Sequence, residues 1–252
     1  DLTGFAAAIY MRGIDFVQIP TTLLAAVDSS VGGKTGADLP EGKNLIGAFH
    51  QPRMVLIDPA LLATLPLAEW RNGLAEVVKY GMILDAGFLA ELERNAARLR
   101  PDYPELTGRI IRRSCECKAA VVAGDERETG RRAILNYGHT VGHAVEKLSE
   151  FRIPHGEAVA IGMAAAVRLA VALNFCPAEV ETRQNALLTA LGLPIAVPGA
   201  MTPEAIIAAM RADKKNRNGA ITMILPRGAG TVEIVRSVDE TKLAAVLREL
   251  RR

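Results

Sequence analysis

The sequence predicts a two-part fold, with an α/β segment over residues 1–66 and an all-α segment over residues 67–252. Short runs of β-branched and apolar residues, separated by glycine and proline, dominate the first part. From Leu67 onward alanine and leucine recur every three to four residues, which is the period of a helix with one buried face. A chain of 252 residues is long enough for two modest domains, and we expect the boundary near Pro66.

The first part is expected to begin with a helix and to contain two short strands. Asp1 can cap a helix, because the residues that follow it are small and apolar. Residues 14–19 form a β-rich run that ends at Pro20, and residues 54–58 form a second one.

The second part is expected to be helical up to a late hairpin. The hairpin strands are residues 220–226 and 231–235, and a last helix covers residues 238–251. The other predicted helices are residues 67–83, 86–98, 104–122, 130–149, 156–174, 179–191 and 203–211.

The composition argues against several classes of function. The formal net charge is +2 and there is no block of lysine or arginine, so nucleic-acid binding is not expected. The three cysteines include no CxxC pair, which is typical of a reducing compartment. Residues 158–173 are too few to span a bilayer and predict a buried helix. No signal peptide is visible, so we expect a cytoplasmic protein with no membrane partner.

Three of the four histidines lie close together in the sequence and suggest a metal site. His139 and His143 are four residues apart, so on a helix they share one face. A third imidazole, from His155, and one carboxylate would complete a site for a divalent metal. The alternative is that these are helix-end or core histidines whose ring nitrogens bond to the backbone.

A second polar group falls on an apolar helix. Glu76 and Lys79 could form an ordinary surface ion pair at a three-residue spacing. The apolar neighbours of Glu76 predict burial instead, where a charge needs a partner or a metal.

A glycine-bearing segment, DSSVGGKT, nearly matches a phosphate-binding P-loop but has Asp28 where the first glycine belongs. The backbone at Gly32 and Gly33 can still approach a ligand closely, and Lys34 can supply positive charge. A simple glycine turn is the alternative.

Further polar side chains are expected near the histidines. Arg132 and Asn136 precede them on the same predicted helix, and Lys118 lies on the helix before. Such groups near a metal favour a substrate with a carboxylate or a phosphate. The polar segment 213–219, taken alone, is more typical of a solvated turn.

Taken together, these motifs resemble the 3-dehydroquinate synthase family of sugar-phosphate cyclases. The resemblance covers essentially the whole chain and includes GLAEVVKYG, NYGHTVGHA and HGEAVAIGM. It implies the trailing part of a Rossmann-like NAD-binding domain in residues 1–66 and a helical metal- and substrate-binding domain in residues 67–252. The strands and glycine-rich turn that cradle the NAD pyrophosphate in the family come before the residue matching Asp1 and are expected to be absent here.

The resemblance also implies the roles of individual residues. Zinc or cobalt is held by Glu76, His139 and His155, whereas His143 becomes an acid–base and phosphate-contacting group; spacing alone would have made both His139 and His143 ligands. Arg12 reaches into a neighbouring subunit's site, which implies a homodimer. The implied catalytic residues are His143, Lys79, Lys34 and Asn136; those that bind substrate are Arg12, Asn44, Lys118, Arg132 and Lys214; those that line the NAD pocket are Asp1, Thr21, Thr22, Asp28, Lys43, Thr64 and Leu65.

The implied activity is that of a carbon–oxygen lyase of the shikimate pathway, which leads to the aromatic amino acids. It converts 3-deoxy-D-arabino-heptulosonate 7-phosphate to 3-dehydroquinate and phosphate, with NAD and a divalent metal as cofactors. Three alternatives stay open: another cyclase of the 2-deoxy-scyllo-inosose or valiolone type, a glycerol-dehydrogenase-like enzyme, and an inactive metal-binding fragment.

Overall fold

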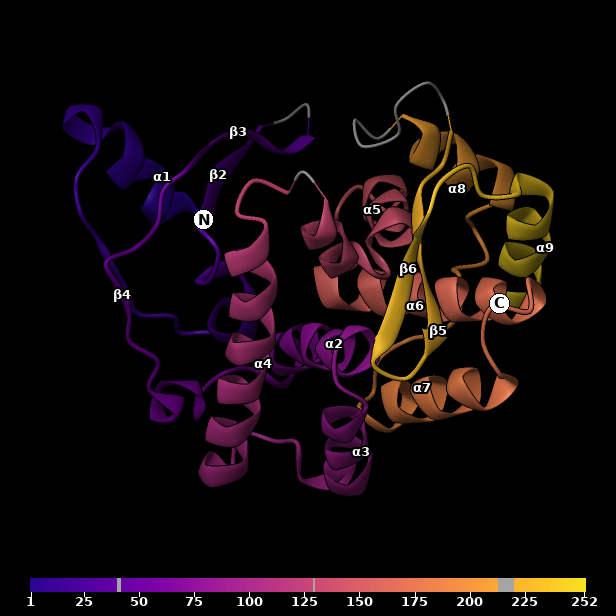
Figure 1. The fold of residues 1–252 in the computed structure, drawn as a ribbon, viewed down its shortest axis with the longest axis horizontal. Coiled ribbons are helices and arrows are strands. Elements are labelled where there is room, and N and C mark those ends of the chain that lie inside the picture. Colours follow the sequence, from indigo (N-terminus) through magenta and orange to yellow (C-terminus); the bar gives the residue numbers. More distant parts are fainter. Residues whose placement is uncertain (40–41, 129, 213–219) are drawn as a thin grey trace. The chain divides into compact units, whose positions relative to one another are not determined.

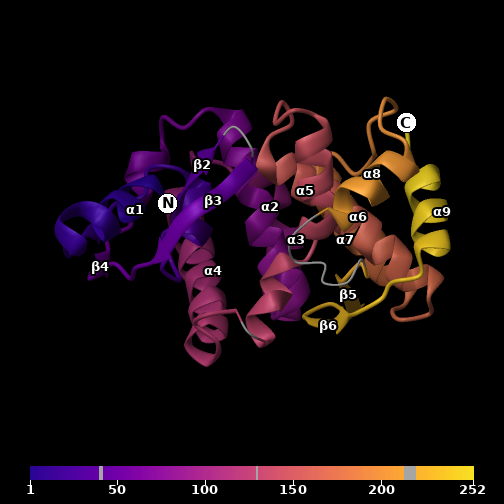
Figure 2. The same ribbon diagram turned by 90° about the horizontal axis from the view of Figure 1, so that it is seen from above.

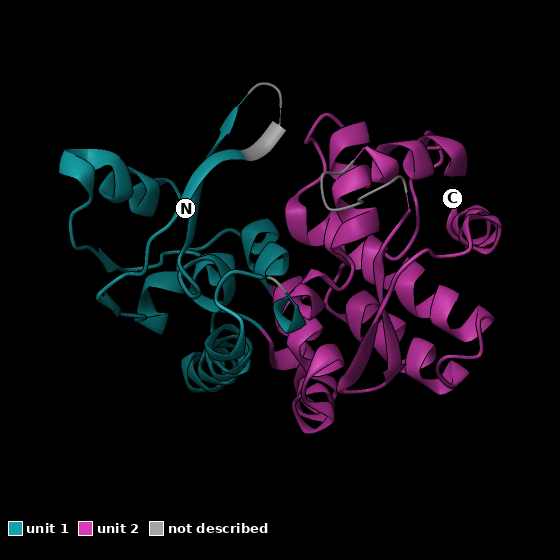
Figure 3. Ribbon diagram, turned by 45° about the horizontal axis from the view of Figure 1, so that its top comes forward, with its two compact units in different colours: residues 1–73, 100–132 teal, residues 74–99, 133–252 magenta. Residues whose placement is uncertain are grey.

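The computed structural model of the chain describes residues 1–39, 42–128, 130–212 and 220–252, with the side chains of residues 42–44 also left out. The chain forms two compact units (Figure 3). The first unit holds residues 1–73 and 100–132, and the second holds residues 74–99 and 133–252. Because residues 100–132 return to the first unit, no single point in the sequence separates the two units. The domain boundary after residue 66 stays a prediction.

In its described residues, the first unit contains the long helix α4, the shorter helix α1 and the strand pairs β1–β4 and β2–β3 (Figure 1). The predicted run 14–19 contributes only the two-residue strand β1, which pairs in parallel with an equally short β4. An antiparallel hairpin of β2 and β3, which the sequence analysis did not predict, follows the glycine-bearing segment. The elements are α1 (Leu2–Ile9), β1 (Val17–Gln18), β2 (Lys34–Leu39), β3 (Gly42–Phe49), β4 (Met54–Val55) and α4 (Pro104–Gly124), with the short turns η1 (Tyr10–Arg12), η2 (Ala25–Ser29) and η3 (Pro59–Leu62).

Helix α4 organises the first unit. Its buried residues Leu106, Ile110, Cys117 and Val121 are spaced by four or seven positions, which places them on one face. This helix packs against η2 and η3, and the thiol of Cys115 donates to the carbonyl oxygen of Ala26 at 3.3 Å. The short turns are therefore held by a long helix from a distant part of the sequence.

The second unit is mainly helical, as predicted. Helix α2 (Leu67–Ile83) begins in the first unit and ends in the second, and its bounds match the predicted ones. The remaining elements are α3 (Ala86–Asn95), η4 (Ala96–Arg98), α5 (His139–Leu148), α6 (His155–Ala172), α7 (Ala178–Ala190), α8 (Pro203–Arg211), β5 (Met223–Gly228), β6 (Thr231–Val235) and α9 (Glu240–Leu250). The short turn η5 (Arg131–Asn136) begins in the first unit and ends in the second.

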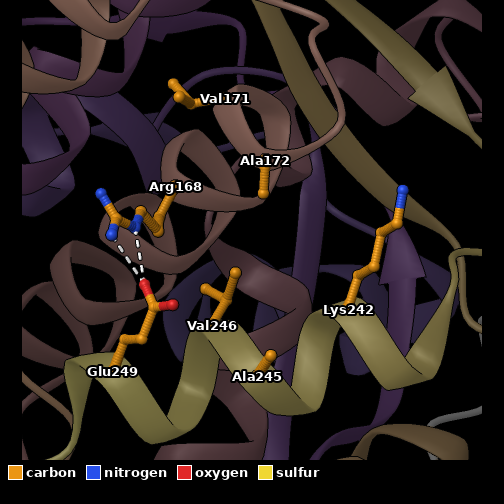
Figure 4. A pocket seen from close by; sticks show the side chains of 7 residues that line it. All are labelled: Arg168, Val171, Ala172, Lys242, Ala245, Val246 and Glu249. Atoms are coloured by element: carbon orange, nitrogen blue, oxygen red, sulfur yellow. Dashed lines mark hydrogen bonds and ion pairs between the residues drawn. The ribbon is translucent and has the colours of Figure 1, made fainter.

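Helix α6 lies at the centre of this unit, against α5, α7, α9 and strand β5 (Figures 1 and 2). Its alanines and glycines are small enough to let several elements approach it at once. In the described part of the chain, α6 is the one helix with the length and hydropathy to cross a membrane, but 72% of it is buried inside the protein. The predicted buried helix is thus confirmed. A shallow surface groove runs between α6 and α9, lined at one end by Arg168 and Glu249 (Figure 4).

The prediction of one continuous helix over residues 130–149 is wrong. A short 3₁₀ turn, η5, ends at Asn136, and α5 begins only at His139. Gly138 between them has φ 80°, a left-handed conformation that breaks the helix. The backbone at Gly138 lies very close to α6, because a Cβ on Gly162 would lie 1.8 Å from the carbonyl oxygen of Gly138.

Candidate metal centre

Glu76 is the buried centre of the site. Its neighbours along α2 are apolar and buried, and its own side chain is fully buried, as predicted. Its Oε1 atom lies 3.6 Å from Nε2 of His139 and 3.6 Å from Nε2 of His155. Lys79, one turn further along α2, forms an ion pair with the other carboxylate oxygen and is itself buried. The surface ion pair that the sequence left open is therefore excluded.

The two histidines meet because their helices pack closely at their first turns. His139 is the first residue of α5 and His155 is the first residue of α6. A Cβ on Gly142 would lie 3.0 Å from the carbonyl oxygen of Ala158, so the glycine lets the two backbones come together. Both imidazoles also lie at helix N-termini, where the partial positive charge works against protonation of the rings.

The ring nitrogens that face away from Glu76 have their own partners. Nδ1 of His139 lies 3.0 Å from the carbonyl oxygen of Tyr137, which can only accept. Nδ1 of His155 lies 3.3 Å from Oε1 of Glu146. When each Nδ1–H donates in this way, each Nε2 presents a lone pair toward Glu76.

The two rings differ in pKa. Burial lowers the pKa of His139 well below its usual value, against the pull of Glu76, with help from the positive charge of Lys79. Burial also lowers the pKa of His155, but hydrogen bonds to Glu146 and Glu76 and the charges of both carboxylates outweigh it and raise this pKa to about 9. The field that holds a proton on His155 is one that would equally attract a metal cation.

The donor set fits a divalent metal. One carboxylate oxygen and two imidazole nitrogens are ligands that zinc and similar ions accept. Two ligands about 2.1 Å from a tetrahedral ion lie about 3.4 Å apart, close to the separations at Glu76. The ligand atoms of Glu76, His139 and His155 all lie within 4.8 Å of one another.

His143 lies beside this set. Its ring centroid is 5.3 Å from that of His139 and 6.3 Å from that of His155. A ring nitrogen of His143 lies within 4.8 Å of ligand atoms of Glu146 and His155. The set of ligand atoms around Glu76 contains His139 and His155 instead. Asn136, at the end of η5, is half-buried in the same unit.

The first unit gathers several of the other predicted residues around the glycine turn. Lys118 donates to the Asp28 carboxylate at 2.7 Å and to the Asp28 carbonyl oxygen at 2.5 Å. The buried Arg132 donates to the carbonyl oxygen of Gly32 at 2.9 Å and to that of Glu126. A side chain at Gly32 would collide with the guanidinium, since a Cβ would lie 2.7 Å from it. Glycine at this position therefore leaves room for the guanidinium of Arg132.

Lys34 directly follows the glycine turn and is the first residue of β2. It is exposed and forms an ion pair with Glu128, whose backbone has a φ of 57°. The expectation that Arg132 precedes the histidines on one helix is wrong, because Arg132 lies on the short turn η5, which ends at Asn136, and α5 begins only at His139.

The remaining predicted residues are spread over the first unit. Thr22 accepts a hydrogen bond from the Ala25 amide at 3.1 Å and so begins the turn that leads to Asp28. Asp1, Arg12, Thr21 and Thr64 are exposed and Leu65 is half-buried, while Lys214 and the side chains of Lys43 and Asn44 lie outside the described residues.

Two groups at the centre were missed by the sequence analysis, Glu146 and the carbonyl of Tyr137. Glu146 follows His139 by seven residues, which is two helical turns, so the same face rule that linked the histidines could have found it. The Tyr137 carbonyl could not have been found, because only the break at Gly138 turns it toward the ring.

The protein thus combines an α/β unit with a helical unit that carries a carboxylate and two imidazoles. This arrangement is typical of a metal-dependent enzyme. Sequence-family models described as the N-terminal and C-terminal parts of 3-dehydroquinate synthase match residues 1–72 and 73–216. A 3-dehydroquinate synthase from Nostoc punctiforme is 54% identical over 98% of this chain and 69% of its own length. One from Xylella fastidiosa strain M12 is 51% identical over 98% of this chain and 68% of its own length. The chain belongs to the 3-dehydroquinate synthase family and is an enzyme of the carbon–oxygen lyase class.

Solved structures of other cyclases share the fold. The 2-epi-5-epi-valiolone synthase from Streptomyces hygroscopicus, with NAD⁺ and Zn²⁺ bound, has a TM-score of 0.91 and 33% identity over 98% of this chain and 69% of its own. A 2-deoxy-scyllo-inosose synthase in complex with carbaglucose-6-phosphate, NAD⁺ and Co²⁺ has a TM-score of 0.87 and 31% identity, over 98% of this chain and 70% of its own. The predicted fold class is confirmed by these neighbours.

Proposed function

We propose that the chain catalyses the 3-dehydroquinate synthase reaction, from 3-deoxy-D-arabino-heptulosonate 7-phosphate to 3-dehydroquinate and phosphate. The convergence of Glu76, His139 and His155 on one point is the observation that carries this proposal. Over the aligned region, relatives of that name are about half identical to this chain, whereas the other cyclases are about one third identical. This difference favours 3-dehydroquinate synthase over the valiolone and inosose types.

Glu76, His139 and His155 would hold a zinc or cobalt ion. A metal bound there would supply Lewis acidity toward a substrate hydroxyl, and bound NAD would supply reversible hydride transfer with no net oxidation. The buried ammonium of Lys79, held beside Glu76, keeps positive charge next to the centre. His143 offers an imidazole close to both histidine ligands, where it can move a proton to or from a bound substrate.

The cationic groups of the first unit suit an anionic substrate. We assign Lys118 and Arg132 to the carboxylate, on the strength of their burial and of the resemblance. Lys79, Asn136, Lys34, Asn44 and Lys214 are assigned to the phosphate side on the resemblance alone.

The NAD pocket and the assembly are part of the same proposal. Asp28 and Thr22 lie on the turn that follows β1, and with Asp1, Thr21, Lys43, Thr64 and Leu65 they are assigned to NAD. Arg12 is exposed, as a residue that reaches into a neighbouring subunit would be, which supports a homodimer. We place the enzyme in the cytoplasm, without a nucleic-acid or membrane partner.

The test is release of phosphate from the heptulosonate phosphate in the presence of NAD and zinc. We expect release that a chelator abolishes and that zinc restores, with no accumulation of NADH. Glucose 6-phosphate serves as the competing substrate: turnover of glucose 6-phosphate alone would replace the proposal with an inosose-type cyclase. Net formation of NADH would show that the chain is a dehydrogenase instead. Bound zinc without any turnover would show that the chain is only a metal-binding fragment.

A further inference from the structure

Glu146 is a second buried carboxylate beside the proposed metal site, and the proposed function gives it no task. It lies on α5, two turns after His139, and its side chain is 2% exposed. Taking a carboxylate out of water costs free energy unless it is paired, so a buried carboxylate at this position needs a partner.

Its partner among the histidines is His155. Oε1 of Glu146 lies 3.3 Å from Nδ1, while Nε2 of the same ring lies 3.6 Å from Glu76. The imidazole is therefore held between two carboxylates, one at each nitrogen. His139 is held differently, because its Nδ1 faces the uncharged carbonyl of Tyr137.

The backbone of Glu146 is fixed without the help of its side chain. Its carbonyl oxygen accepts from the hydroxyl of Ser149 at 2.8 Å and from the amide of Phe151 at 2.8 Å. These bonds close the end of α5 and persist when only the carboxylate is changed. A substitution at this position can therefore test the carboxylate by itself.

We propose that Glu146 is a positioning residue that fixes the orientation and tautomer of His155 and thereby strengthens metal binding. By accepting a hydrogen bond from Nδ1–H it keeps the proton on Nδ1 and the lone pair on Nε2, toward Glu76, and makes Nε2 a stronger donor to a cation. This inference rests on the proposed metal site.

A different reading of the same cluster is a second cation held by His143, Glu146 and His155, whose ligand atoms lie within 4.8 Å of one another. The chemistry of the ring disfavours it. A neutral imidazole has one lone pair, and His155 cannot give that pair to one ion through Nε2 and to another through Nδ1 without losing its last proton.

The experiment measures zinc affinity by competition with a chromophoric chelator, using the full chain. The variants are Glu146→Leu, which removes the acceptor, and Glu146→Gln, which keeps an acceptor oxygen but not the charge. Glu150→Gln is the matched control, since Glu150 is an exposed carboxylate just past the end of α5. Cobalt absorption reports the ligand geometry, and thermal unfolding without metal reports whether each variant folds.

We expect one zinc per wild-type chain, and affinity that falls about 10- to 100-fold in Glu146→Leu, less in Glu146→Gln and not at all in Glu150→Gln. The cobalt spectrum should change in the Glu146 variants alone. Wild-type affinity in both folded Glu146 variants would overturn the positioning role while leaving the metal site intact. Two zinc ions in the wild type, of which only one is lost with Glu146, would also overturn it. A wild type that binds no zinc would overturn the proposed function itself.

Discussion

The metal centre of the second unit and the glycine turn of the first unit are both polar clusters, but their charges are arranged in opposite ways. At the centre, Glu76 and the histidines turn their donor atoms toward one common point. At the turn, Lys118 donates to the carboxylate of Asp28 and Arg132 donates to the carbonyl of Gly32, whereas Nε of Arg132 has no hydrogen-bond partner among the described residues. The centre is arranged to receive a cation as it stands. At the turn, Lys118 must give up its bonds to Asp28 before it can hold an anion.

The largest effect is expected from removing a donor at the centre. His139→Gln should reduce zinc affinity by more than the roughly 10- to 100-fold typical of an outer-shell change, because it deletes a ligand. Phosphate release should fall below detection at stoichiometric zinc. Zinc content after dialysis and phosphate release at stoichiometric zinc are the two measurements.

The fourth histidine provides the control for that experiment. His50 lies in the first unit, where it stacks on Phe16 and bonds to the carbonyl of Ile14. His50→Gln should keep its zinc. If both variants lost zinc equally, the ligand assignment would be wrong.

A smaller effect is expected from the turn. Lys118→Met removes a charged donor, and a hydrogen bond to a charged group contributes about 1.5–3 kcal/mol, which corresponds to about 10- to 150-fold in kcat/KM. Zinc affinity should not change, because the two clusters bind different partners. Arg113→Met, an exposed cation on the same helix, is the control and should retain full activity. Loss of zinc from Lys118→Met would break the distinction between the clusters.

The sequence predicted the metal centre better than the turn, and the reason is physical. Periodicity places residues on a helix face, so the burial of Glu76 and the shared face of His139 and His143 could be read from spacing. The start of α5 could not be read from spacing, because it depends on a contact between Gly138 and Gly162, which are far apart in the sequence. The hairpin of β2 and β3 was not predicted, because its glycines and polar residues do not show the alternation of apolar and polar residues that indicates a strand.

The packing that builds the centre can be tested at that contact. Gly162→Ala would place a Cβ 1.8 Å from the carbonyl oxygen of Gly138, so α5 and α6 must move apart. Overpacking of this kind costs about 1–3 kcal/mol, which for a chain of this size lowers the melting temperature by about 2–12 °C. We also expect weaker zinc binding, since the two histidines begin these helices. Gly124→Ala at the end of α4, where a Cβ meets nothing within 4 Å, should leave both quantities unchanged. Wild-type zinc affinity in a destabilised Gly162→Ala would show that the centre tolerates a shift of α5.

The smallest effect is expected at a polar cluster that belongs to neither region, in the groove between α6 and α9 (Figure 4). Arg168 bonds to Glu249 at 2.7 Å and lies 3.4 Å from Glu181, but its side chain is 43% exposed. Water and salt screen such pairs, so Arg168→Ala should cost about 0.2–1 kcal/mol, a shift in melting temperature of a few degrees at most, with zinc affinity and turnover unchanged. The shift should shrink further at high salt, because exposed pairs are screened within about 10 Å at 0.1 M. A large loss of zinc in this variant would mean that α6 transmits strain along its length to His155, and the centre would then be less rigid than its packing indicates.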